Sequence, residues 1–331
     1  MSDLKVGVLG GGSWATAITK IITTNNQPVN WWIRNPETTK FIQQNKRNPH
    51  YLSSVEFDSS KLNISTNLLQ TIQHSDAVIF AIPSAFLKDT LKDLPIDCFK
   101  NKIVVSAIKG MIPGENLIIA EFFHLHYQVP LENVVVISGP CHAEEVALEK
   151  LSYLTIASKG EKNCQTICSL LSCNFIKTVP SDDIYGTEYG AVLKNIYALC
   201  AGICHGLGYG DNFQAVLISN AIREMKRFVD VVHPITRDIN DSAYLGDLMV
   251  TAYSQFSRNR TFGAMIGKGY SVIAAQLEMN MVAEGYYASA CVYNVNKKYK
   301  VDMPIANAVY NILYQKVSPI VEIRLLTNSL N

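Results

Sequence analysis

The sequence predicts an α/β protein: an N-terminal Rossmann-type domain with a doubly wound, mostly parallel sheet, followed by an all-α C-terminal domain. Three observations support this prediction. A glycine-rich turn joins a buried strand to a helix near the N-terminus, short apolar strands then alternate with helical segments, and after Pro180 only helical periodicity remains. Because 331 residues exceed one typical core, we expect two domains, residues 1–183 and 184–331.

Composition excludes several classes of protein. With 48% hydrophobic residues and a net charge of +1, the chain is typical neither of a disordered protein nor of one that binds nucleic acid. We find no apolar run of the roughly 18 residues that a membrane span needs, and the N-terminus does not read as a secretory signal. We therefore expect a cytoplasmic protein.

The eight cysteines contain no Cys-x-x-Cys pair. This pattern favours buried thiols in a reducing compartment over disulfides or a metal site. Cys204 with His205 is the one candidate metal pair, and it is the weaker alternative. We therefore expect no bound metal.

The first strand, at residues 4–9, leads into the sequence G-G-G-S-W-A and then a helix to about Thr24. In this position G-x-G-x-x-A is the fingerprint of a dinucleotide-binding turn. Gly10 allows the tight turn, Gly12 lets the backbone approach a pyrophosphate, and Ala15 allows the helix to pack closely on the strand. The start of the helix offers free N–H groups and partial positive charge to the phosphates.

The second strand, at residues 29–33, ends at Arg34, and Asn35 with Pro36 opens the next helix. NAD-specific proteins often place an acidic residue here to bind the ribose 2′-hydroxyl. A guanidinium instead suits the 2′-phosphate of NADP. Arg34 therefore favours NADP over NAD, and a surface arginine without a ligand is the alternative.

Further strands are predicted at residues 76–82, 103–107, 134–137, 154–157 and 175–179, with a helix from Ser84 to about residue 93. Ligands of such sheets bind beyond the carboxyl ends of the strands. The turns at residues 10–14, 83–86, 109–110 and 139–140 should therefore share one rim. This position makes Lys109 a candidate ligand-binding residue, with a solvated turn lysine as the alternative.

Helices are predicted at residues 184–204, 219–232, 244–253, 271–298 and 305–314. In the first of them, Lys194 lies beside an apolar stripe, and Gly190 one turn earlier leaves the lysine uncovered. Such a lysine either extends to solvent or is held in a cleft for proton transfer. The loop at residues 257–263 contains Arg258, Asn259 and Arg260, a combination suited to binding an anion.

An ordered set of short motifs spans nearly the whole chain. They are G-G-G-S-W-A-T-A, I-K-G, S-G-P, A-V-L-K-N-I, G-D-N, L-G-D-L, S-R-N-R and V-A-E-G. On these motifs the chain resembles the NAD(P)-dependent glycerol-3-phosphate dehydrogenases. The resemblance implies reversible hydride transfer between NAD(P)H and dihydroxyacetone phosphate, giving sn-glycerol 3-phosphate for glycerophospholipid synthesis. A homodimer is the candidate assembly.

The resemblance also implies roles for individual residues. Lys194 matches the proton-transfer lysine, Lys109 the second active-site lysine, and Asp247 the aspartate that supports them. The matched cofactor contacts, beyond the glycines, are Ser13, Trp14, Arg34, Lys109, Ala143, Arg258, Val282 and Glu284. The matched substrate contacts, beyond the catalytic three, are Gly139, Cys141, Ser257, Arg258 and Asn259. Cys141 departs from the small hydroxyl residue that the family usually has there.

The chemistry of a ketone reduction agrees with two lysines. A ketone that accepts a hydride becomes an alkoxide, which needs a proton and stabilisation of its charge. A neighbouring ammonium and burial would lower the pKa of a lysine from its usual ~10.4, whereas Asp247 would raise it. Two alternatives remain: a dehydrogenase of another small keto or hydroxy acid, and a non-catalytic NAD(P)-sensing protein, which would need the glycines but neither lysine.

Overall fold

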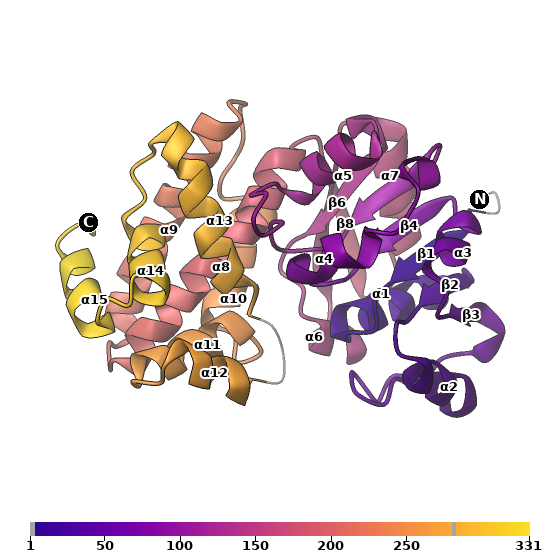
Figure 1. The fold of residues 1–331 in the computed structure, drawn as a ribbon, viewed down its shortest axis with the longest axis horizontal. Coiled ribbons are helices and arrows are strands. Elements are labelled where there is room, and N and C mark those ends of the chain that lie inside the picture. Colours follow the sequence, from indigo (N-terminus) through magenta and orange to yellow (C-terminus); the bar gives the residue numbers. More distant parts are fainter. Residues whose placement is uncertain (1–3, 280–282) are drawn as a thin grey trace. The chain divides into compact units, whose positions relative to one another are not determined.

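The computed structural model describes residues 4–279 and 283–331, and these residues form two compact units (Figure 1). The sheet unit contains the residues up to Ile82, Phe86–Ile108 and Ile119–Ile184. The helical unit contains Pro83–Ala85, Lys109–Ile118 and Tyr185–Asn331. Two short segments that follow strands of the sheet, around Ser84 and Lys109, therefore belong to the helical unit.

The sheet unit is built on one sheet with the order β3-β2-β1-β4-β5-β6-β7-β8. The strands are β1 (Val6–Leu9), β2 (Val29–Trp32), β3 (Leu62–Ser65), β4 (Ala77–Phe80), β5 (Ile103–Ser106), β6 (Val134–Ser138), β7 (Ser152–Ser158) and β8 (Ile176–Ser181). Every neighbouring pair is parallel except β6 and β7, which are antiparallel. The predicted doubly wound, mostly parallel sheet is confirmed.

The strand predictions hold for all strands but one. Only β3 is not predicted by the sequence, because Leu62–Ser65 is a strand of four residues that is only partly buried at the sheet edge. The helices of this unit are α1 (Ser13–Thr24), α2 (Pro36–Asn45), α3 (Leu68–Gln73), α4 (Ser84–Leu91), α5 (Ile119–Tyr127), α6 (Ala143–Ala147) and α7 (Glu161–Leu171). The predicted cap of α2 is confirmed, because the Asn35 side chain accepts hydrogen bonds from Glu37 N and Thr38 N.

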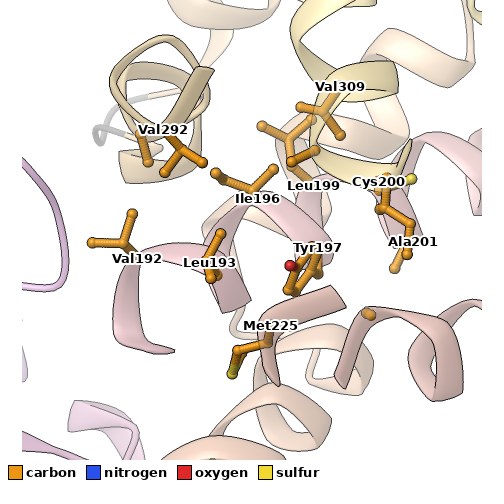
Figure 2. Packing of buried hydrophobic residues seen from close by; sticks show 14 of the residues in the cluster. Val192, Leu193, Ile196, Tyr197, Leu199, Cys200, Ala201, Met225, Val292 and Val309 are labelled. Atoms are coloured by element: carbon orange, nitrogen blue, oxygen red, sulfur yellow. The ribbon is translucent and has the colours of Figure 1, made fainter. Parts of the chain in front are cut away.

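The helical unit is organised around α8 (Ile184–Gly206). Its predicted apolar stripe is buried, and Figure 2 shows Leu193, Ile196 and Tyr197 packed together in a cluster that includes side chains of other helices. The other helices are α9 (Asp211–Val232), α10 (Asp247–Tyr253), α11 (Arg258–Gly267), α12 (Val272–Glu278), α13 (Glu284–Tyr299), α14 (Pro304–Tyr314) and α15 (Pro319–Thr327), and a π-helical turn spans Ser242–Gly246. The predicted all-α C-terminal region is confirmed.

Two local predictions in this unit are wrong. The single helix predicted at residues 271–298 is two helices, since α12 ends at Glu278 and α13 begins at Glu284. The loop predicted at residues 257–263 is the start of α11, with Ser257 as its N-cap accepting from Arg260 N at 3.3 Å.

Glycines of α8 and α11 have a packing role. A Cβ on Gly263 would lie 2.1 Å from Leu199 O of α8, and one on Gly202 of α8 would lie 2.1 Å from Arg260 O of α11. Glycine at both positions therefore lets the backbones of the two helices touch, as small residues do at close helix crossings. This crossing holds α11 against the C-terminal part of α8, at residues 199–206.

The described helices include none that is long and apolar enough to cross a bilayer. All eight cysteines are free thiols, and six of them are buried: Cys141, Cys164, Cys168, Cys200, Cys204 and Cys291.

Candidate active site

Two lysines of the helical unit, Lys109 and Lys194, meet at the carboxylate of Asp247; we call these three residues the lysine group. Lys194 of α8 forms an ion pair with Asp247 Oδ1, and Lys109 Nζ lies 3.7 Å from Asp247 Oδ2. The side chains of Lys194 and Asp247 are only 3% and 2% exposed, whereas that of Lys109 is 21% exposed. One buried aspartate therefore holds two ammonium groups, and one of these remains accessible.

Burial sets the proton affinity of Lys194. It lowers the pKa of Lys194 below its usual value, and the nearby Lys109 ammonium lowers it further. The Asp247 carboxylate acts in the opposite direction by stabilising the charged lysine. Because burial is the largest of these effects, Lys194 gives up its proton more readily than a lysine in water.

Neighbouring residues hold the lysine group in place. Asn195, adjacent to Lys194 on α8, donates from Nδ2 to the Lys109 carbonyl oxygen at 2.8 Å. Thr251 donates its hydroxyl to the Asp247 carbonyl at 2.6 Å and lies 3.4 Å from Asp247 Oδ1. Helix α8 therefore positions both lysines. Lys194 belongs to this helix, and Asn195 of the same helix holds the backbone of Lys109.

The structure gives Gly190 a different role from the one that the sequence suggested. A Cβ on Gly190 would lie 3.0 Å from Tyr244 Cδ1, so the missing side chain makes room for the Tyr244 ring. Tyr244 belongs to the π-helical turn that precedes Asp247. The glycine therefore accommodates the turn that leads to Asp247 and does not uncover Lys194, which is itself buried.

The start of α11 lies near Asn195, the residue that follows Lys194 on α8. Asn259 Oδ1 accepts from Gly285 N at 2.9 Å, and a Cβ on Gly285 would lie 2.6 Å from Asn195 O. The N-termini of α11 and α13 therefore meet at α8. A helix N-terminus that begins with Arg258 is suited to a phosphate group.

Glu284, the first residue of α13, binds the segment around Ser84. Its carboxylate accepts from Ser84 N at 3.0 Å and from Ser84 Oγ at 2.5 Å. Burial raises the pKa of Glu284, while these hydrogen bonds and Arg258 act to lower it. A Cβ on Gly110 would lie 2.3 Å from Glu284 Oε2, which explains the glycine after Lys109. The sequence predicts a helix from Ser84 but gives no signal for its contact with Glu284, because the two residues are 200 positions apart.

The sheet unit contains the predicted dinucleotide turn, residues 10–12, which we call the glycine loop. Gly10 has a φ of +133°, and a Cβ there would lie 2.4 Å from Ala81 O, so the position requires glycine. A Cβ on Gly12 would meet no described atom within 4 Å. Gly12 is the N-cap of α1. This open cradle at a helix N-terminus fits a pyrophosphate.

Other predicted ligand residues lie near the ends of β2 and β6. Arg34 is exposed just beyond β2. Gly139 has a φ of +113° directly after β6, and Cys141 is buried in the apolar cluster of the sheet unit. Ala143 begins α6.

The structure thus gathers the predicted residues into two groups, one in each unit. The helical unit holds Lys109, Lys194, Asp247, Ser257, Arg258, Asn259 and Glu284, and the sheet unit holds Gly10, Gly12, Ser13, Trp14, Arg34, Gly139, Cys141 and Ala143. Val282 lies outside the described residues.

A doubly wound sheet whose first turn is an open glycine loop is built to bind a dinucleotide, and paired lysines on a buried carboxylate supply acid–base chemistry. Together they define the class of dinucleotide-dependent dehydrogenases. The family models of NAD-dependent glycerol-3-phosphate dehydrogenase match residues 5–164 for the N-terminus and residues 183–324 for the C-terminus. The chain belongs to this family and is an NAD(P)-dependent oxidoreductase.

Individual relatives agree with the family models. The chain is 36% identical over 325 residues to the glycerol-3-phosphate dehydrogenase (NAD(P)+) of Bacillus velezensis, covering 96% of this chain and 93% of that one. It is 32% identical over 315 residues to the enzyme of the same name from Staphylococcus carnosus, covering 95% and 94%.

Solved structures show the same fold. The crystal structure of glycerol-3-phosphate dehydrogenase from Coxiella burnetii matches with a TM-score of 0.90 at 27% identity, covering 98% of this chain and 99% of that one. D-mandelate dehydrogenase with NADH matches with a TM-score of 0.61 at 18% identity, covering 95% and 98%, and shows a likeness of fold alone.

Proposed function

We propose that this protein reduces dihydroxyacetone phosphate to sn-glycerol 3-phosphate with NAD(P)H, and catalyses the reverse reaction. The observation that carries the proposal is the pairing of Lys194 and Lys109 on the buried carboxylate of Asp247, near the start of α11. Family membership supports the same substrate. The product would feed glycerophospholipid synthesis.

The proposed reaction gives each residue of the helical unit a task. The carbonyl carbon of the substrate would accept a hydride that a bound nicotinamide cofactor would supply, and the C=O double bond would open to leave an alkoxide oxygen. Lys194 Nζ donates its proton to the resulting oxygen, and the Lys109 ammonium stabilises the negative charge that develops there. In the reverse direction, neutral Lys194 accepts the proton of the substrate hydroxyl.

The two ends of the substrate are proposed to bind differently. The phosphate binds Arg258, Asn259 and the N-terminal N–H groups of α11, with Ser257 at the cap. Binding energy from this non-reacting group orients the carbonyl for reaction. Gly139 and Cys141 are proposed to contact the remainder of the substrate, and the Cys141 thiol is a weaker hydrogen-bonding group than the usual hydroxyl.

The cofactor is proposed to bind at several places. The glycine loop, Ser13 and Trp14 would hold the pyrophosphate, and Arg34 would bind a 2′-phosphate, which favours NADPH over NADH. Lys109, Ala143, Arg258, Val282 and Glu284 are the remaining proposed contacts. The protein is further proposed to be cytoplasmic and to form a homodimer, which light scattering in solution would test.

A cofactor-oxidation assay tests the proposed function. NADPH and NADH are each mixed with dihydroxyacetone phosphate, with dihydroxyacetone, or with a panel of small 2-keto acids. The proposal expects rapid oxidation with dihydroxyacetone phosphate and at least a hundredfold slower turnover without the phosphate. Faster turnover of a keto acid would identify a different dehydrogenase, and cofactor binding without any turnover would identify a sensor.

A further inference from the structure

The backbone carbonyls of the glycine loop are all occupied by hydrogen bonds from inside the sheet unit. Trp31 Nε1 donates to Gly10 O at 2.7 Å, and Asn48 Nδ2 donates to Gly11 O at 3.0 Å. Gly12 O accepts from Thr16 N at 3.0 Å and from Thr16 Oγ1 at 2.9 Å. Trp31 and Asn48 lie far beyond the G-x-G-x-x-A fingerprint in the sequence, whereas Thr16 directly follows it.

This arrangement orients the N–H groups of the same peptides. In a trans peptide the N–H points away from the C=O of the preceding residue. Carbonyls of Gly10, Gly11 and Gly12 that are held toward the protein therefore turn the N–H groups of Gly11, Gly12 and Ser13 the other way. Within the described part of the chain, the Gly11 and Gly12 N–H groups have no backbone acceptor. Successive N–H groups on one side form a concave anion site.

The peptide between Gly11 and Gly12 is the one that most needs an external restraint. Glycine has no Cβ to restrict its backbone, so a peptide flanked by two glycines can flip at little cost. A flip would turn the Gly11 carbonyl oxygen toward the anion and remove the Gly12 N–H from it. Asn48 holds this carbonyl and thereby opposes the flip.

Asn48 is itself held rigidly. It is completely buried, at 0% exposure, although it lies in the segment after α2. Its Nδ2 also donates to Thr16 Oγ1 at 2.9 Å, and its Oδ1 accepts from His50 N at 3.0 Å and Tyr51 N at 3.2 Å. Rotation of the amide would break several buried hydrogen bonds at once, which is costly.

We propose that Asn48 is a positioning residue of the pyrophosphate site, acting with Thr16 and Trp31 to lock the glycine loop with its N–H groups toward the ligand. The proposal rests on the proposed binding of the cofactor at this loop. Asn48 acts through the loop backbone and not through contact with the cofactor. The ligand part that it serves is the diphosphate, which NADH and NADPH share.

The test is Asn48→Ala, with dissociation constants for NADPH and NADH measured by fluorescence titration. Both constants should rise at least tenfold, equivalent to about 1.4 kcal/mol. The Michaelis constant for the cofactor should rise far more than kcat falls. Adenosine 2′-monophosphate, which has no 5′-diphosphate, should bind wild type and variant equally in a competition assay.

Asn25→Ala is the matched control in the same unit. The Asn25 side chain also donates two hydrogen bonds to backbone carbonyls, to Leu170 O and Ser172 O at 2.9 Å each, but it holds α1 to the α7 region and not the glycine loop. This control should lower the thermal midpoint without changing either cofactor constant. Equal losses of cofactor affinity in both variants would overturn the proposal.

Variants of Thr16 keep the proposal testable if Asn48→Ala does not fold. Thr16→Val removes the hydroxyl that links Asn48 to Gly12 O and should weaken both cofactors, whereas Thr16→Ser keeps the hydroxyl and should restore the affinity. Unchanged affinity in folded Asn48→Ala or Thr16→Val, or an equal loss for adenosine 2′-monophosphate, would contradict the inference. A wild-type protein that does not bind NADPH would instead refute the proposed cofactor site.

Discussion

The glycine loop and the lysine group both provide positive charge, but they do so by different physical means. The glycine loop has a helix N-terminus and oriented backbone N–H groups, which do not titrate. The lysine group uses side-chain charges, of which that of Lys194 is buried against Asp247 and has its pKa lowered by that burial. We therefore expect the first region to determine affinity for the cofactor and the second to determine turnover and its dependence on pH.

The largest expected effect is the loss of kcat in Lys194→Met, which separates turnover from affinity for the cofactor. Lys194→Met keeps the length of the side chain and removes the ammonium, so kcat should fall by roughly 10²–10⁴ if Lys194 transfers the proton. The dissociation constant for NADPH should remain unchanged, because the glycine loop is untouched. Lys226→Met, which removes an exposed lysine paired with Asp230, is the control and should keep full turnover. Turnover of Lys194→Met within threefold of wild type would show that this lysine is not the acid.

Two alanine substitutions in the glycine loop should differ in their effect on thermal stability. Gly10→Ala introduces a Cβ 2.4 Å from Ala81 O at a φ of +133°, so it should lower both stability and cofactor affinity. Gly12 has a φ of −82°, and its Cβ would meet no described atom within 4 Å. Gly12→Ala should therefore keep its thermal midpoint and weaken NADPH at least tenfold. A stable Gly12→Ala that binds NADPH normally would mean that the ligand does not approach this backbone.

A smaller effect is expected at the end of β2. Arg34→Ala should raise the Michaelis constant for NADPH about tenfold, or about 1.4 kcal/mol, and leave that for NADH nearly unchanged. Steady-state kinetics with each cofactor measure this difference. Equal changes for the two cofactors would remove Arg34 from the 2′-phosphate site.

The smallest effect is expected at Cys141. Because thiols form weaker hydrogen bonds than hydroxyls, Cys141→Ser should keep kcat/KM for dihydroxyacetone phosphate within a few-fold of wild type. Bulky alkylation at Cys141, quantified by mass spectrometry, should instead block substrate binding. Full activity of completely alkylated enzyme would place Cys141 away from the substrate.

The sequence predicted the glycine loop well because its evidence is local. Gly10 and the flanking strand and helix lie within a short stretch, and backbone geometry demands the glycine. The assembly of the lysine group could be inferred only through a family resemblance, because its members are far apart in the chain. The pairing of Ser84 with Glu284 had no sequence signal at all.

Tertiary contacts also explain two other differences between the sequence predictions and the structure. The segment at residues 257–263 was predicted as a loop, yet it begins α11, where Gly263 serves the close crossing of α8 and α11. Asn48 was not singled out because a polar residue after a helix usually lies in an exposed turn, whereas here it is buried under the glycine loop. In both cases tertiary contacts, which a single sequence does not display, determine the residue.

The pH dependence of kcat, at saturating NADPH and dihydroxyacetone phosphate, tests the central claim most directly. Protonated Lys194 is the proposed acid in the reduction, so kcat should fall as pH rises through a pKa lowered from the usual value by burial, and in the oxidation of sn-glycerol 3-phosphate it should rise through the same range. Since Asp247 raises this pKa, the residual activity of Asp247→Asn should show both midpoints at lower pH. Profiles of the same sign in both directions, or midpoints that do not move in Asp247→Asn, would contradict the assignment of Lys194 as the proton-transfer residue.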